Sequence, residues 1–256
     1  MSERARLQAI YRYPVKGLSA EPLDRTRLEP GQTIVADRRY AVENGPSGFD
    51  PAAPSYLPKN RFLMLMRNER LARLESRYDD ASGMLTIRDG SREVARGALS
   101  TAAGRKTIED FLAVFCADEL RGPPRVLQAP GHSFSDVSRK VVSIINLASV
   151  AAVETLAGAA VHPLRFRGNL YVADWPAWHE FDLVGREIAI GATVRVKVRK
   201  RIERCAAIDV DPDTGIRDLA LPRLMAQTLG HFDCGVYAEV TAAGEIAAGD
   251  TIAGIG

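Results

Sequence analysis

Val194-Arg-Val-Lys-Val-Arg199 is a run of alternating apolar and basic residues, and it continues through Lys200-Arg-Ile-Glu-Arg204 to Cys205. Apolar residues at every second position are the pattern of a β-strand with one buried face. Ile188-Ala-Ile190, just before this run, has the same alternation. The stretch therefore predicts neighbouring strands of a β-rich fold and places a cysteine where the longer strand ends.

Cys205 has four cations within six residues, namely Arg199, Lys200, Arg201 and Arg204. Nearby positive charge favours the thiolate form of a cysteine, which can bind a metal, act as a nucleophile or carry sulfur. The alternative is that Cys205 packs as a small core hydrophobe, as many free cysteines do. The local sequence leaves both interpretations open.

The 256 residues are enough for one large or two medium domains, and the composition of 46% hydrophobic and 26% charged residues is ordinary for a folded domain. A net charge of +2, without a basic block, argues against a nucleic-acid-binding protein. No apolar run approaches the roughly 18 residues that span a bilayer, and the first residues lack a signal-peptide pattern. We therefore expect no membrane span and no nucleic-acid partner.

The chain has three cysteines, at 116, 205 and 234, and no CxxC pair. This count argues against a disulfide framework or a zinc ribbon and favours a cytoplasmic location. Its four histidines are scattered, so a structural zinc site is not expected. The glycine-rich signatures of nucleotide-binding loops are also absent.

Short strands separated by turn residues dominate the first hundred residues, which predicts a barrel-like β domain. A proline- and glycine-rich loop is expected over 44–60, followed by a strand or helix over 61–66. The expected strands are 7–15, 23–28, 33–42 and the hairpin around 84–88.

Helical spacing predicts a helix over 107–120, with Thr107 as the N-cap and Cys116 on its apolar, core-facing side. Gly122-Pro123-Pro124 then marks a domain boundary, so we expect domains at 1–124 and 125–256. The second half is again β-rich with a few helices. Its expected elements are a strand over 141–145, a helix over 148–157 ending at Gly158, a short helix over 217–229 interrupted by Pro222, and a hairpin joining 236–240 to 245–246.

Several separated motifs resemble the molybdenum-cofactor sulfurase C-terminal (MOSC) domain family together with its N-terminal β-barrel domain. The likeness covers nearly the whole chain in one order, and no single motif carries it. The motifs are Tyr13-Pro-Val-Lys-Gly17, Asp37-Arg-Arg-Tyr40, Arg165-Phe-Arg-Gly-Asn169, Gly185–Gly191, Arg204-Cys205 followed by Asp211-Pro-Asp-Thr-Gly215, and Gly244–Asp250.

Three positions depart from the family pattern. Ile202 stands where the family has the first cysteine of its Cys-x-Arg-Cys motif, and Cys234-Gly235 stands where it has Phe-Gly. Gly17 replaces a serine that often follows the lysine, which removes one expected hydroxyl contact to cofactor phosphate. The second, ligand-type cysteine is retained as Cys205.

The resemblance implies a mainly β protein with some α structure, built of two β-barrel-like lobes with molybdenum cofactor (molybdopterin) bound in a cleft between them. Cys205 would be the catalytic thiolate and metal ligand. The implied cofactor-binding residues are Lys16, Gly17, Arg38, Asn146, Ser149, Arg167, Asn169, Arg204 and Asp211. Arginine and lysine suit a phosphate, and the turn from Asn146 to Ser149 would offer helix N-terminal amides.

Each of these residues also has an ordinary structural interpretation. Lys16 and Arg38 could be solvated surface charges, Arg167 could pair with Glu203 or Asp209, and Asn169 could be a turn residue. For Asp211 and Thr214 the turn role is favoured. The segment Trp175-Pro-Ala-Trp-His-Glu180 could line a substrate mouth, but a loop packed down by its aromatic side chains is the favoured interpretation.

The leading functional prediction is a molybdenum-dependent oxidoreductase that reduces N-hydroxylated small molecules, similar to the amidoxime-reducing proteins of the family. The chain shows no flavin or iron–sulfur signature, so an external flavin or iron–sulfur reductase would supply electrons. The family also suggests a relation to pyridoxal-phosphate-type proteins. The alternatives are a sulfur-carrier or cofactor-handling protein with a Cys205 persulfide, and a non-catalytic anion-binding module.

Overall fold

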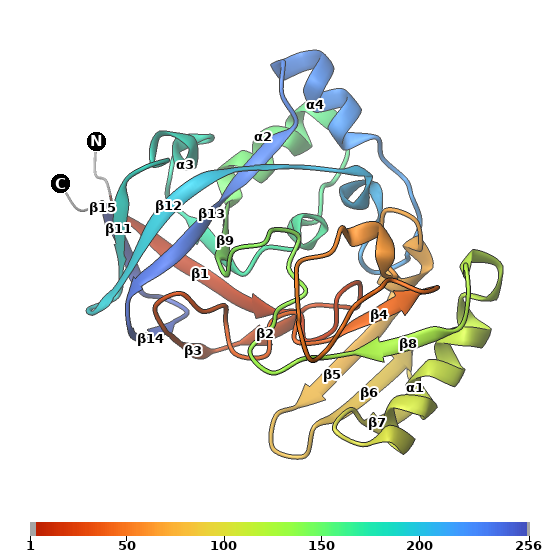
Figure 1. Ribbon diagram of the computed structural model, residues 1–256. Coiled ribbons are helices and arrows are strands. Elements are labelled where there is room, and N and C mark those ends of the chain that lie inside the picture. The colour runs from red at the N-terminus through yellow and green to blue at the C-terminus, as the bar shows by residue number, and fades with distance from the viewer. Residues whose placement is uncertain (1–3, 255–256) are drawn as a thin grey trace.

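Seven strands close into a barrel, and the first strand of the chain is the one that closes it (Figure 1). The computed structural model describes residues 4–254. Around the barrel the order is β10-β9-β13-β12-β11-β15-β1, and β1 pairs back onto β10. These strands are β1 (Arg4–Arg12), β9 (Val142–Asn146), β10 (Leu170–Ala173), β11 (Glu187–Ile190), β12 (Val194–Glu203), β13 (Asp233–Ala242) and β15 (Thr251–Gly254).

All neighbouring barrel strands are antiparallel except β9 and β10, which are parallel. A parallel pair needs a crossover, and helix α2 (Leu147–Ala157) lies within it. Three short strands extend the barrel: β2 (Glu21–Leu23) pairs with the end of β1, and β3 (Arg25–Leu28) pairs with β14 (Gly244–Ala247).

Alternating side chains of the barrel strands fill its interior. On β12 the buried residues are Val194, Val196, Val198 and Ile202, and Val196 and Val198 lie opposite Val240 and Ala238 of β13. This confirms the strand predicted from the alternation. A bulge after Val198 then breaks the period, so that three consecutive basic residues, 199–201, face outward.

The second lobe packs a helix against small sheets. Its strands are β4 (Ala41–Asn44) paired with β8 (Pro124–Leu127), and the meander β5 (Leu74–Asp79), β6 (Met84–Asp89) and β7 (Arg92–Ala98). Helix α1 (Ala102–Phe115) covers the meander (Figure 1). Ile108 and Leu112 of α1 and Cys116 just after it join the buried core of this lobe, as predicted for Cys116.

The remaining helices are short. They are α3 (His179–Asp182), α4 (Leu221–Leu229) and the 3-10 turns η1 (Lys59–Arg61), η2 (Glu69–Arg73), η3 (Ala117–Glu119), η4 (Pro163–Phe166) and η5 (Ala206–Asp209). Within residues 4–254, no helix combines the length and the apolar character needed to cross a membrane. The mainly β fold class with some helix is confirmed.

The strand or helix expected over 61–66 is absent, because these residues hold only the end of η1, an isolated bridge and a turn. Other predicted elements have different bounds. Helix α1 begins at Ala102, because Thr101 caps it by accepting from the Gly104 amide at 3.0 Å, and the glycine in its first turn hid this start. Segment 33–42 is mostly turn, since Ala36 and Arg38 have left-handed backbone with φ of 62° and 50°. Helix α4 begins at Leu221 and carries its proline in the first turn, where no backbone bond is lost.

The chain passes between the lobes more than once. Strand β1 lies in the barrel with strands of the second half, whereas β8 pairs with β4 in the smaller lobe. A single cut near residue 124 therefore follows the order of the sequence but not the arrangement of the strands in space.

The contact between α1 and β7 depends on two glycines. A Cβ atom on Gly104 would lie 2.2 Å from the Ala98 carbonyl oxygen, and one on Gly97 would lie 2.2 Å from the Gly104 carbonyl oxygen. Both obstacles are backbone atoms, so the helix would have to move. We expect Gly104→Ala to lower the free energy of unfolding by about 1–3 kcal/mol, measured by denaturant titration.

The sign of the change in the free energy of unfolding shows whether the helix is hindered at this position. In an unhindered helix position, alanine stabilises the protein by about 1 kcal/mol relative to glycine. Ala103→Gly, at the exposed neighbouring position of α1, serves as the control for helix propensity alone. A more stable Gly104→Ala protein would show that the helix does not approach the sheet this closely.

Candidate functional site

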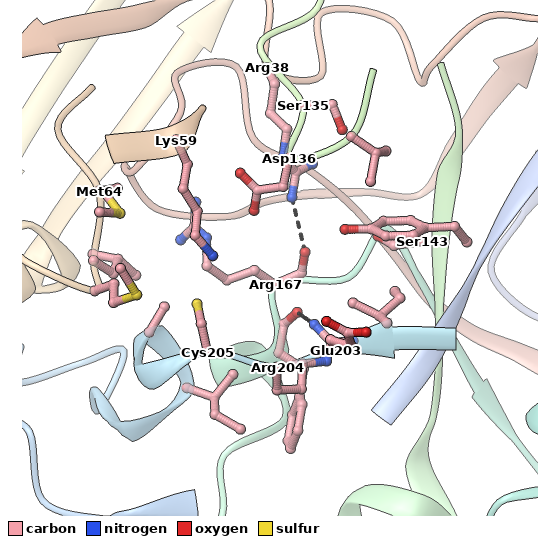
Figure 2. A pocket seen from close by; sticks show the side chains of 18 of the residues that line it. Arg38, Lys59, Met64, Ser135, Asp136, Ser143, Arg167, Glu203, Arg204 and Cys205 are labelled. Carbon is pink, nitrogen blue, oxygen red and sulfur yellow. Dashed lines mark hydrogen bonds between the residues drawn. The ribbon is translucent and has the colours of Figure 1, made fainter. Parts of the chain in front are cut away.

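A cavity of about 450 Å³ lies between the lobes. Residues from both halves of the sequence line it, so the segments predicted to converge do meet (Figure 2). Of the predicted site residues, seven line the cavity: Lys16, Gly17, Arg38, Arg167, Asn169, Arg204 and Cys205. The volume is within the range typical of small-molecule and cofactor sites.

Positive charge predominates in the lining. The basic residues are Lys16, Arg38, Lys59, Arg165, Arg167, Lys200, Arg201 and Arg204, and the acidic residues are Asp37, Asp136, Glu203 and Asp233. Concave surfaces with an excess of one charge concentrate ligands of the opposite charge. The cavity therefore favours an anionic ligand.

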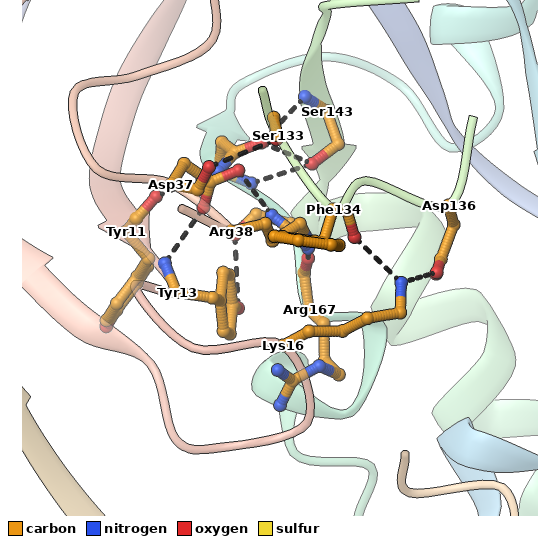
Figure 3. Close-up of polar contacts among 12 residues, drawn as sticks. Tyr11, Tyr13, Lys16, Asp37, Arg38, Ser133, Phe134, Asp136, Ser143 and Arg167 are labelled. Carbon is orange, nitrogen blue, oxygen red and sulfur yellow. Dashed lines mark hydrogen bonds and ion pairs between the residues drawn. The ribbon is translucent and has the colours of Figure 1, made fainter. Parts of the chain in front are cut away.

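Tyr13 organises two of these cations at the end of β1 (Figure 3). The guanidinium carbons of Arg38 and Arg167 lie 4.7 and 4.4 Å from the centre of its ring, and its hydroxyl donates to the Gly168 carbonyl at 3.2 Å. Arg38 donates to Asp37 at 2.5 Å and to the Arg167 carbonyl at 3.1 Å. The two arginines thus form one fixed unit.

Arg38 and Arg167 also share an uncommon backbone conformation. Both are left-handed, with φ of 50° and 49°. This conformation raises the conformational free energy of a non-glycine residue, and residues that adopt it concentrate at functional sites. Within residues 4–254 Arg167 forms no ion pair, so the alternative pairing with Glu203 or Asp209 does not occur.

Lys16 is a buried cation and not a solvated surface charge, with 6% of its surface exposed. Its ammonium donates to the Phe134 carbonyl at 2.9 Å and to the Asp136 carboxylate (Figure 3). Burial lowers the pKa of Lys16, and Arg38 and Arg167 add to that effect, while Asp136 opposes it.

Two residues of this cluster, Lys59 and Asp136, were not identified from the sequence. Burial by itself raises the pKa of Asp136, but Lys16, Arg38 and Lys59 hold it well below its usual range. Both residues lie in or beside loops with no alternating pattern, so only the folded structure brings them to the cavity. A sequence signal was available only for Lys59, as a cation within a proline-rich loop.

Cys205 is the second residue after the end of β12 and is partly exposed at the cavity. The Lys59 side chain extends toward the Cys205 thiol (Figure 2). Burial lowers the pKa of Lys59, but Cys205 and Asp136 raise it, and the net direction is upward. Figure 2 shows Lys59, Arg167 and Cys205 converging on the same space, with Met64 on the far side.

Gly17 cannot carry a side chain without strain. Its φ is 88°, and a Cβ atom would lie 2.8 Å from the Leu63 carbonyl oxygen. The backbone geometry therefore explains why a glycine stands at this cavity position.

Asn169 and Arg204 line the cavity, but their polar atoms are largely used to hold the walls. Asn169 accepts from the Ser143 amide at 3.0 Å and donates to the Tyr11 carbonyl at 3.1 Å. Arg204 donates to the carbonyls of Phe166, at 2.8 Å, and Cys234. These bonds hold the walls of the cavity in place. The polar groups of Asn169 and Arg204 are therefore already bonded to the protein.

Three predicted binding residues lie outside the cavity lining. Asn146 and Ser149 are fully buried, and both donate to the Glu180 carboxylate, at 2.8 and 2.9 Å. The expected anion at this helix start is therefore a side chain of the protein itself. Asp211 accepts from Thr214 within its turn and pairs with Arg165 at 3.1 Å, which agrees with its structural interpretation.

The tryptophan-containing loop packs against the protein. Trp175 is 5% exposed and belongs to the barrel core, Trp178 is partly buried against it, and neither lines the cavity. The packing interpretation of this loop is therefore confirmed.

Sequence profiles assign both parts of the chain. The MOSC domain profile matches residues 129–253, and the profile of the MOSC N-terminal beta barrel domain matches residues 4–118. This chain belongs to the MOSC family. MOSC domains are related to molybdenum-cofactor sulfurases and often bind the cofactor.

Two solved structures with low similarity accompany these matches. The YUAD protein from Bacillus subtilis has a TM-score of 0.46 and 12% sequence identity, covering 97% of this MOSC chain and 94% of its own. YiiM from Geobacillus stearothermophilus has a TM-score of 0.36 and 17% identity, covering 45% of this chain and 54% of its own. No curated protein matches the sequence.

The chemistry of the lining fits the cofactor that many MOSC proteins bind. A phosphate calls for several N–H donors of fixed geometry, which Lys16, Arg38 and Arg167 supply, and molybdenum accepts a soft thiolate such as that of Cys205. Within the described residues, no cluster of three or more His, Cys, Asp or Glu side chains is arranged to hold a metal ion.

The three thiols should differ sharply in reactivity. Burial raises the pKa values of Cys116 and Cys234 to about 12, and both are essentially inaccessible. Their thiolate fractions at pH 8 are then on the order of 10⁻⁴. We expect iodoacetamide to label only Cys205 in the native protein, as read by peptide mass spectrometry, and all three cysteines in denaturant.

The kinetics provide the control for that measurement. Labelling of Cys116 and Cys234 should proceed only as fast as the protein unfolds, whereas Cys205 should react without a lag. Equal labelling of Cys234 and Cys205 in the native state would contradict the assignment of Cys205 as the accessible thiol.

Proposed function

We propose that this MOSC protein is a molybdenum-cofactor-dependent reductase that removes oxygen from N-hydroxylated small molecules. The observation that carries the proposal is the position of one partly exposed thiol, Cys205, in an inter-lobe cavity with a marked excess of positive charge. A polyanionic cofactor with a thiophilic metal matches both properties.

Each group in the cavity has a role in this proposal. Lys16, Arg38 and Arg167 would hold the anionic end of the cofactor, and Cys205 would bind the metal through its sulfur. When bound, the cofactor supplies a two-electron centre for the reaction R–NHOH + 2e⁻ + 2H⁺ → R–NH₂ + H₂O. The electrons would come from an external flavin or iron–sulfur protein, because the chain has no signature for either group.

The wall near Cys205 indicates how a substrate would be received. Met64, Leu65 and Met66 line the cavity and offer an apolar surface that adapts to different shapes. Lys59, beside the thiol, would donate a hydrogen bond to a polar substrate oxygen. The protein would therefore accept a substrate with an apolar body and one small N-oxygenated group.

A sulfur-carrier function is the second candidate, and the position of Lys59 on the Cys205 side of the cavity favours it specifically. A persulfide anion on Cys205 would gain a charge-assisted hydrogen bond from this ammonium. Metal analysis separates the two candidates, since a sulfur carrier need not retain molybdenum.

Replacing the thiol tests the leading proposal directly. In Cys205→Ser the hydroxyl cannot replace a thiolate ligand, so we expect reduction of an amidoxime with an artificial electron donor to fall by at least 100-fold. The pterin should remain bound through its phosphate contacts. The assays are the turnover rate and the ratios of molybdenum and pterin to protein, in material from a host that makes the cofactor.

Cys116→Ala and Cys234→Ala are the matched controls. Each removes a buried sulfur from a hydrophobic core and should cost on the order of 1 kcal/mol of stability while leaving turnover intact. Normal turnover by Cys205→Ser would rule out the metal–thiolate mechanism, and an inactive but folded Cys234→Ala protein would move the ligand role to that residue.

A further inference from the structure

The Asp136 carboxylate lies among the cations of the cavity. It accepts a hydrogen bond from Lys16 (Figure 3), and it lies in the same space as the side chains of Arg38, Lys59 and Arg167 (Figure 2). It comes from the segment 128–141 between β8 and β9, which forms neither helix nor strand. One half-exposed carboxylate thus lies among four cations.

The cations are held by the fold, whereas Asp136 reaches them from outside. Arg38 is bonded to Asp37 and to the Arg167 carbonyl, Arg167 donates to the Leu18 carbonyl at 2.8 Å, and Lys16 donates to the Phe134 carbonyl. The side chain of Lys16 is 7% exposed, but that of Asp136 is 47% exposed. Arg38, Arg167 and Lys16 would therefore each keep a protein partner if the Asp136 side chain turned outward.

Asp37, the other carboxylate of this cluster, is built into the wall. Its side chain is 3% exposed, and it accepts the Tyr13 amide at 2.8 Å in addition to Arg38. Removing it would leave the buried Tyr13 amide without an acceptor and Arg38 without its carboxylate partner. The two carboxylates therefore differ, because Asp37 is buried and bonded to two protein groups of the wall, whereas Asp136 is half exposed and its carboxylate bonds to Lys16.

We propose that the Asp136 carboxylate occupies the anion position of this cavity when no ligand is present, and that a phosphate-like dianion binds by displacing it. The position is defined by Lys16, Lys59, Arg38 and Arg167. The inference requires only that the cavity binds an anion, so it is independent of the reductase chemistry proposed above.

The difference in charge explains why a phosphate-like dianion would displace the Asp136 carboxylate. With Asp136 turned outward, Asp37 is the one carboxylate of residues 4–254 that an observed hydrogen bond joins to any of these four cations, and it is bonded to Arg38. A phosphate monoester offers two charges and three acceptor oxygens where the Asp136 carboxylate offers one charge and two. Rotation of the Asp136 side chain breaks its ion pair with the buried Lys16, and the incoming dianion restores a negative partner for that cation. The backbone carbonyl of Asp136 can keep its bond from the Tyr56 hydroxyl.

In the test, inorganic phosphate is titrated into the cofactor-free protein, and isothermal titration calorimetry measures the dissociation constant. If Asp136 competes with the anion, Asp136→Asn should bind phosphate about tenfold more tightly than the wild type, because the competitor has lost its charge. Lys16→Met and Lys59→Met should each weaken phosphate binding, since both cations belong to the position.

Asp110→Asn is the matched control. Asp110 is an exposed aspartate on α1 that also forms an ion pair with a lysine, Lys106, and it lies outside the cavity lining. The Asp110→Asn variant loses the same charge as Asp136→Asn but at a position outside the cavity. Its affinity for phosphate should therefore equal that of the wild type. A similar gain in Asp110→Asn would attribute the effect to net charge and overturn the proposal.

Weaker or unchanged phosphate binding by Asp136→Asn would also overturn the exchange, and so would the absence of binding by both proteins. Asp136→Ser provides a second variant and should show the same gain, with circular dichroism confirming the fold of each. None of these titrations involves molybdenum or turnover, so an inactive cofactor-loaded enzyme and a failed exchange are distinguishable results.

Discussion

The pairing of β1 with β10 is the interaction on which the cavity depends. The Tyr11 amide donates to the Asn169 carbonyl at 2.7 Å, and the Asn169 side chain returns a bond to the Tyr11 carbonyl. This register brings the end of β1 beside the turn that carries Arg167, although the two segments are about 155 residues apart in sequence. Without it, Lys16 and Arg167 would have no reason to share a ligand.

Several cations in one enclosed space repel one another and lose contact with water. Main-chain carbonyl groups offset much of this cost by accepting hydrogen bonds from the cations. Arg38, Arg167 and Lys16 each donate to a main-chain carbonyl, which carries only a partial negative charge. Arg38 and Lys16 are also paired with the carboxylates of Asp37 and Asp136. Carbonyl dipoles fix the geometry of a cation without neutralising it. The cavity thereby keeps an excess of positive charge for a ligand while its walls remain satisfied.

The sequence predicted the strands and the convergence of the main site residues, because alternation and ordered motifs are local signals that survive folding. Prediction from the sequence was wrong or incomplete where tertiary contacts decide which residues reach the cavity. Asn146 and Ser149 have the pattern of a helix start that could bind an anion, yet Glu180, about 30 residues away in sequence, already occupies that place. Lys59 and Asp136 reach the cavity from irregular segments, and no periodicity marks such residues in advance.

Closure of the barrel by β1 also has a consequence for synthesis on the ribosome. Its barrel partners are β10, beginning at Leu170, and β15, beginning at Thr251. At about 5–20 residues per second, β1 waits on the order of ten seconds or more for the first of them. During that time its hydrogen-bonding edges are open to other chains. Its exposed positions alternate with buried ones and include Arg4 and Arg6, and such edge charges discourage pairing with the wrong strand before the right one has been made.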